Sequence, residues 1–126
     1  MTQVKLIYLA CPFRHPDPMV QKKRCAAARY TTAHLSLKGH HVFSPLTHNE
    51  PLIEVIHDAV PGEHWMLFDL AILAGCKKLY ILTMEGWESS KGVAREIAFA
   101  MSNGLPIQHI APPEEHEYLH LLLEKV

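Results

Sequence analysis

Two serines, a glycine and a glutamate at close helical spacing are the residues of this sequence best suited to chemistry. Ser89 and Ser90 are followed by Gly92, and Glu96 comes four residues after the glycine. The serines predict the start of a helix, because their side chains can accept hydrogen bonds from its first N–H groups. The free N–H groups and positive dipole end of such a helix bind anions, and Glu96 shares an edge with Gly92. The spacing therefore predicts either an anion pocket overlooked by Glu96 or a capped surface helix with an exposed glutamate.

A second carboxylate stands in an apolar setting. Asp69 is the only charged residue between Trp65 and Cys76. An ionised carboxylate in such a helix needs a partner, a pocket or a raised pKa, because bare burial is costly. Asp69 is therefore predicted either to face a ligand or to cap a neighbouring loop.

Four further side chains are candidates for substrate binding. Arg14 directly follows the first predicted strand, where an arginine can hold a phosphate through two parallel hydrogen bonds or simply be solvated. Tyr8 lies on that strand and could turn its hydroxyl into the site, or only pack. Trp87 could stack on a base, and His48, together with Asn49, could line the opposite wall.

The hydrophobic pattern predicts a βαβαβαβα order that would position these residues. The predicted strands are 4–10, 41–43, 79–83 and 105–110, and the predicted helices are 18–38, 62–75, 90–103 and 113–125. The basic residues of the first helix fall mostly off its apolar stripe. Residues 45–61 show no clean period and contain several prolines, which is typical of a lid or binding loop.

This alternation predicts one α/β domain over residues 1–126, a flavodoxin-like or Rossmann-like doubly wound parallel sheet in three α/β/α layers. Ligands of such sheets bind outside the carboxyl ends of the strands, where the strand order reverses. The rule selects three loops, at residues 11–17, 45–61 and 85–92.

Composition excludes several classes of protein. The 126 residues carry a formal charge of -1 with both signs interspersed, so no basic face for a nucleic-acid polymer is expected. The first apolar run lacks a basic leader and is too short for a membrane span, which favours a cytoplasmic protein without membrane contact. The unpaired cysteines predict buried thiols in a reducing compartment; they are Cys11, Cys25 and Cys76.

The remaining motifs argue against other chemistries. The sequence contains no phosphate-binding P-loop, no dinucleotide fingerprint and no Gly-x-Ser-x-Gly elbow. Ten histidines invite a metal hypothesis, but His116 and His120, four apart on a predicted helix, are typical of a solvated face.

With these residues assembled, the chain resembles the nucleoside 2-deoxyribosyltransferase superfamily, which includes the 2'-deoxynucleoside 5'-monophosphate N-hydrolases. It is most similar to the branch called domain of unknown function 1937. The matching stretches are 8–14, 43–48, 65–69 and 86–96. Pro12 and Cys11 stand where the hydrolases carry serine and glycine, so nucleosides and nucleoside 5'-monophosphates both remain candidate substrates.

The resemblance implies a role for each matching residue. Glu96 would attack the anomeric carbon of the sugar and form a covalent glycosyl intermediate, and Asp69 would assist the leaving base or the sugar. Arg14, Ser90 and Gly92 would hold the 5'-phosphate. The resemblance also implies a homo-oligomer, because related enzymes complete their pockets from a neighbouring chain.

The residues and the resemblance together predict an N-glycosidase or deoxyribosyltransferase. Cleavage of an N-glycosidic bond passes through an oxocarbenium-like state, for which two carboxylates suffice and no metal or organic cofactor is required. A non-catalytic sensor that binds a nucleotide-like ligand in the same crevice is the alternative. A metal hydrolase built on the histidines is a third hypothesis.

Overall fold

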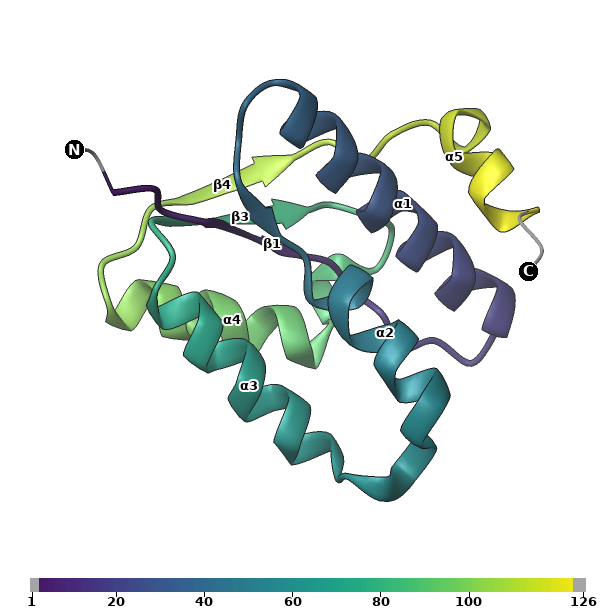
Figure 1. Cartoon of the computed structure of the whole chain (residues 1–126), viewed down its shortest axis with the longest axis horizontal. Coiled ribbons are helices and arrows are strands. Elements are labelled where there is room, and N and C mark those ends of the chain that lie inside the picture. Colours follow the sequence, from purple (N-terminus) through teal and green to yellow (C-terminus); the bar gives the residue numbers. More distant parts are fainter. Residues whose placement is uncertain (1–2, 124–126) are drawn as a thin grey trace.

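A parallel β-sheet lies between two layers of helices (Figure 1). The computed structural model describes residues 3–123. The strands β1 (Ile7–Ala10), β2 (Val42–Phe43), β3 (Lys78–Leu82) and β4 (Ile107–Ile110) form a four-stranded sheet in the order β2-β1-β3-β4, and every pair is parallel. All four residues of β1 are buried, as expected for a central strand covered on both faces. The predicted α/β class with a parallel sheet is confirmed.

Alternate residues of β1 face opposite helix layers, because successive side chains of a strand point to opposite sides. Tyr8 and Ala10 pack with residues of α3 (Gly62–Ala74) and α4 (Lys91–Ser102). Ile7 and Leu9 pack with residues of α1 (Pro18–Leu37) and α5 (Glu115–Leu122). Two hydrophobic clusters therefore hold the sheet, one on each face.

Most helix boundaries agree with the sequence predictions to within a few residues. Ser90 caps α4, since its Oγ accepts a hydrogen bond from the N–H of Val93 at 3.2 Å. Ser89 does not share this role: it lies in the 3₁₀ turn η2 (Trp87–Ser89), and its hydroxyl donates to the carbonyl of Gly86 at 3.1 Å. The last two residues of the predicted helix 113–125 lie outside the described residues.

The predicted loop at 45–61 is wrong, because most of it is helical. The segment forms α2 (Pro45–Ile56) and a short 3₁₀ turn, η1 (His57–Ala59). Ser44 accepts a hydrogen bond from the N–H of Thr47 at 3.3 Å, and Pro45 occupies the first turn, where its missing N–H costs nothing. Pro51 interrupts the pattern of apolar residues but lies exposed within the helix. The two prolines made this segment resemble a loop in sequence, although it begins as an ordinary helix.

The thiols are less buried than predicted. Cys76 is buried, whereas Cys11 and Cys25 are only partly so, and all three are free. In residues 3–123 no helix is both long and apolar enough to cross a membrane.

Candidate functional site

A cavity of about 780 Å³ opens at the carboxyl ends of the strands. The chain leaves β1 toward β2 on one side and later returns to β3 on the other, so the strand order reverses between β1 and β3. Each of the three segments that the switch-point rule selected contributes to the walls. The lining residues are Cys11, Phe13 and Arg14; Pro45 and Leu46; Gly62, Glu63, Met66 and Asp69; and Ser89, Ser90, Lys91, Gly92, Val93, Arg95 and Glu96.

Glu96 is a half-buried carboxyl group that is hydrogen-bonded to a residue of the sheet. The hydroxyl of Tyr8, which is fully buried on β1, donates a hydrogen bond to Oε2 of Glu96. Burial raises the pKa of Glu96 to about 7; the hydrogen bond from Tyr8 opposes the rise and the negative charge of Asp69 adds to it. Within residues 3–123 no hydrogen bond reaches the other oxygen, Oε1. Glu96 therefore presents one oxygen to the cavity and titrates near neutral pH.

Asp69 enters the same cavity from α3. The side-chain amide of Asn49 donates a hydrogen bond to Oδ1 of Asp69 at 2.8 Å. Burial raises the pKa of Asp69, whereas the Asn49 bond and the nearby His48 ring lower it. The charge of Asp69 also raises the pKa of Glu96, so the two carboxyl groups interact across the cavity.

The start of α4 forms the positive part of the cavity wall. Within the described part of the chain, no acceptor bonds the N–H groups of Lys91 and Gly92, whereas Ser90 accepts from the next two, those of Val93 and Ala94. The side chains of Arg14, Lys91 and Arg95 add three cations to the lining. A helix N-terminus with free N–H groups and flanking cations is suited to an anion.

A buried arginine of the first helix joins two of the wall segments. It is an exception to the expectation that the basic residues of this helix lie mostly off its apolar stripe. Arg24 of α1 is 6% exposed, and its guanidinium donates to the carbonyl of Arg14 at 3.0 Å and to that of Glu85 at 2.7 Å. Gly86 adopts φ 87°, and a Cβ on it would lie 2.9 Å from Nη2 of Arg24. One side chain thus fixes both the segment after β1 and the turn after β3.

Five of the eight predicted site residues line this one cavity: Arg14, Asp69, Ser90, Gly92 and Glu96. Tyr8 reaches it through its bond to Glu96.

Two predicted binding residues do not line the cavity. His48 is exposed on α2, where its ring stacks on Phe68 with centroids 5.4 Å apart and reaches Asp69 only through Asn49. Trp87 is half-buried against the sheet cluster, and its ring meets His109 edge-on at 5.2 Å.

Sequence reasoning named Asn49 beside His48 as a possible wall residue but missed its contact with Asp69, and it missed Arg24 as a determinant of the site. The Ser44-Pro45 pair predicts a helix start and would have placed Asn49 on a helix. No local signal marks Arg24 as buried, because its two acceptors are backbone carbonyls at residues 14 and 85.

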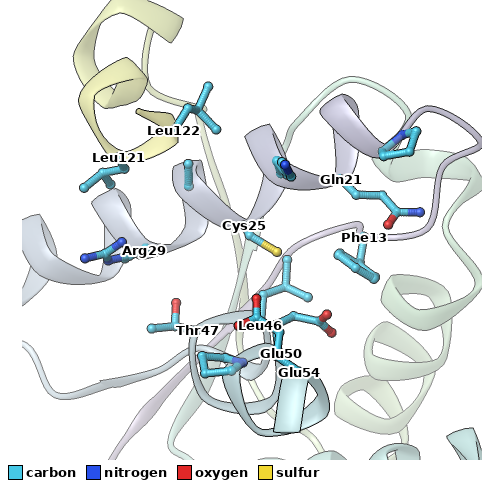
Figure 2. A pocket seen from close by; sticks show the side chains of 14 residues that line it. Phe13, Gln21, Cys25, Arg29, Leu46, Thr47, Glu50, Glu54, Leu121 and Leu122 are labelled. Carbon is cyan, nitrogen blue, oxygen red and sulfur yellow. The ribbon is translucent and has the colours of Figure 1, made fainter. Parts of the chain in front are cut away.

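A second cavity, of about 570 Å³, lies between α1 and α2 (Figure 2). Cys25 extends from α1 toward Leu46, and Glu50 and Glu54 follow on α2. Phe13 and Leu46 line both cavities, so these two side chains form the wall between them. None of the eight predicted site residues lines this second cavity.

The histidines predicted to be solvated are so. His116 and His120 are exposed on α5. Among residues 3–123, no three His, Cys, Asp or Glu side chains gather as a set of metal ligands.

Comparison with known proteins shows the family of the chain. The family model "Domain of unknown function (DUF1937)" matches residues 5–111, and the chain belongs to this family. The match includes all strands, the helices α1 to α4 and every residue that lines the cavity. No curated protein matches the chain. The family description names no activity.

Proposed function

We propose that this member of the DUF1937 family is an N-glycosidase or deoxyribosyltransferase that acts on a nucleoside or nucleoside 5'-monophosphate, with Glu96 as its nucleophile. The observation that carries the proposal is the convergence of Glu96 and Asp69, from α4 and α3, on one cavity, with Tyr8 bonded to Glu96. The resemblance of the sequence to the nucleoside 2-deoxyribosyltransferase superfamily supports the same roles for the two carboxylates.

The chemical step needs a carboxylate below the sugar and a way to stabilise charge. Ionised Glu96 attacks the anomeric carbon through Oε1, the C–N bond to the base breaks, and the electron pair leaves with the base, which takes a proton from solvent; the nucleophile of the second step returns a proton to solvent when it attacks. Water, or a second base in a transferase, then displaces the carboxylate and restores Glu96. Tyr8 holds Oε2 throughout, so Oε1 needs no reorientation before the attack.

The positive N-terminus of α4 would orient a nucleotide substrate in the cavity. A 5'-phosphate would accept hydrogen bonds from the backbone at Lys91 and Gly92 and from the Arg14 guanidinium. The sugar would then lie over Glu96, four residues further along the helix. The cationic side chains of Arg14, Lys91 and Arg95 in the cavity lining favour the binding of a nucleoside monophosphate over that of an uncharged nucleoside.

The proposal is tested by incubating the protein with a panel of deoxyribo- and ribonucleosides and their 5'-monophosphates. We expect free base to appear with at least one substrate, measured by chromatography, and Glu96→Ala to lower the rate at least a thousandfold, because it removes the nucleophile. Glu88→Gln is the matched control, since Glu88 is exposed just before α4 and does not line the cavity.

Two results would contradict the proposal. One is the absence of base release by the wild type with every substrate, and the other is a Glu96→Ala rate equal to that of Glu88→Gln. A thermal shift with nucleotide in wild type and Glu96→Gln alike, without turnover, would instead support a sensor that binds in the same cavity.

A further inference from the structure

We propose that Asn49 is a positioning residue: it anchors Oδ1 of Asp69 so that Oδ2 is presented to the substrate as a hydrogen-bond acceptor, and His48 fixes the orientation of the Asn49 amide. The inference rests on the proposed function for its catalytic consequence. The contact itself can be tested without turnover.

Two consecutive residues of α2 dock on two consecutive residues of α3. Asn49 donates to Asp69 at 2.8 Å, and the ring of His48 stacks on that of Phe68 with an interplanar angle of 15°. Asn49 is only 4% exposed, which makes it one of the few buried polar side chains among residues 3–123. Both the oxygen and the NH₂ group of this buried amide are hydrogen-bonded. Rotating the amide would break these hydrogen bonds at a cost in free energy, so its orientation is well defined.

The other end of the amide fixes which way it points. Nδ1 of His48 lies 2.8 Å from Oδ1 of Asn49. Because the amide NH₂ donates to Asp69, its oxygen is left to accept, and the His48 tautomer with a proton on Nδ1 supplies the matching donor. The chain of hydrogen bonds thus runs from imidazole to amide to carboxylate in one direction.

Asp69 retains one oxygen for a ligand. Its only hydrogen bond within residues 3–123 is the one to Oδ1, and the residue lines the cavity beside Glu96. A carboxylate held at one oxygen by a neutral donor stays ionised more readily than one left bare in the same apolar surroundings. Asp69 is therefore suited to accept a hydrogen bond from a sugar hydroxyl or a base amino group.

The surrounding charges make Asp69 dependent on this bond. The titratable groups that face Asp69 from other elements are His48 on α2, Glu96 on α4 and Tyr8 on β1. Burial favours protonated Asp69, whereas the Asn49 bond and His48 favour the ionised form. Loss of Asn49 would remove one of the two contacts that favour the ionised form.

The first test is a double-mutant cycle with Asn49→Leu and Asp69→Asn. We expect Asn49→Leu to lower kcat about tenfold to a hundredfold in the wild-type background, with a smaller change in KM, because misplacement of a catalytic group by about 1 Å costs this much. In the Asp69→Asn background the same substitution should lower kcat less than twofold, since Asn49 acts through Asp69. Equal losses of kcat in both backgrounds would overturn the inference, because an effect of Asn49 on the fold alone would be the same with or without the Asp69 carboxylate.

The second test measures the contact directly by NMR titration of the Asp69 side-chain carboxyl carbon. We expect the pKa of Asp69 to rise in Asn49→Leu and to stay unchanged in Val55→Ala, a control at an exposed position of the same helix. An unchanged Asp69 titration in Asn49→Leu would overturn the inference even if the enzyme is active. Conversely, if the wild type releases no base but Asn49→Leu still raises the pKa of Asp69, the result would contradict the proposed function and not the contact between Asn49 and Asp69.

Discussion

At the scale of single residues, the Tyr8 hydroxyl decides which oxygen of Glu96 remains for chemistry. A fully buried phenol on the central strand bonds Oε2 and leaves Oε1 toward the cavity. The same bond favours the charged form of a carboxyl group whose pKa burial raises to about 7. Tyr8 therefore controls both the geometry and the ionisation of the proposed nucleophile.

The pH dependence of base release follows from this contact. A nucleophilic glutamate must be ionised, so kcat/KM of the wild type should rise with pH around a midpoint near 7. Tyr8→Phe removes a donor that stabilises the carboxylate, so the pKa of Glu96 should increase and the rising limb should move to higher pH, with a rate loss of about tenfold near neutrality. The measurement is the pH profile of kcat/KM.

Tyr30→Phe is the matched control for this experiment. The Tyr30 hydroxyl donates to Glu117 at 3.2 Å on the other side of the sheet, so its loss should leave the profile in place. A Tyr8→Phe profile that coincides with that of Tyr30→Phe would show that the phenol does not control the nucleophile.

Sequence reasoning found the two carboxylates and named Tyr8 and Asn49 as possible site residues, but it did not predict which of them contacts which carboxylate. Glu96 and Asp69 stand out by spacing and by isolation in an apolar helix, both of which are local signals. The contact between Tyr8 and Glu96 joins residues 88 apart in sequence, and the contact between Asn49 and Asp69 joins residues 20 apart. Such partners depend on how elements pack, which local spacing does not encode.

At the scale of elements, α2 shows how a helix can be read as a loop. Its start was marked by Ser44 and Pro45, while Pro51 broke the apolar period over which a helix is recognised. The consequence for the site is direct, because the helical conformation is what turns Asn49 toward α3.

Arg24 couples two elements, and its removal has a predictable cost. Arg24→Met keeps the apolar stem but leaves the carbonyls of Arg14 and Glu85 without this donor, so the free energy of unfolding should fall by about 2 kcal/mol, as expected for lost hydrogen bonds to a charged group. Urea denaturation measures the change. Amide exchange near residues 14 and 85 should quicken as well.

Lys22→Met serves as the comparison, since Lys22 is exposed on the same helix. Its stability should stay within about 0.5 kcal/mol of the wild type. Equal stabilities of the two variants, with unchanged exchange near residues 14 and 85, would mean that the guanidinium does not hold these segments.

At the scale of the whole molecule, α3 and α4 leave an apolar surface uncovered. Leu67 of α3 is 58% exposed and Met101 of α4 is 70% exposed, and alanines of both helices, Ala71 and Ala98, are exposed as well. The only charged residue between His64 and Ala74 is Asp69, which faces the cavity instead. Such a surface on two contacting helices is suited to a second copy of the chain.

The prediction is a homodimer that buries this surface. Leu67→Glu should shift the molar mass measured by light scattering from dimer to monomer, because a buried, unpaired carboxylate is costly at an apolar interface. Val55→Glu is the control, since Val55 is 76% exposed on α2, outside the predicted interface. A monomeric wild type, or a Val55→Glu variant that dissociates while Leu67→Glu does not, would contradict the assignment.

The fold class and the position of the cavity were predictable from the sequence, whereas the contacts that hold the site together were not. Continuous apolar runs at β1 and β3, separated by amphipathic helices with glycines at their ends, indicate a parallel sheet by pattern alone. The position of the cavity followed from the switch-point rule. The clamp formed by Arg24 depends instead on two backbone carbonyls that no sequence pattern identifies.

The turn at Gly86 carries two restraints of different origin, and they imply an order in which related sequences can diverge. Its φ of 87° disfavours most side chains, and a Cβ would lie only 2.9 Å from Nη2 of Arg24, which is held by its hydrogen bond to the carbonyl of Glu85. A chain without the arginine would keep only the backbone restraint, whereas a chain that retains the arginine would have to displace its guanidinium before the glycine could be replaced. Asparagine tolerates left-handed backbone best among residues with a Cβ, so it should appear at this position only in lineages from which the arginine has already gone.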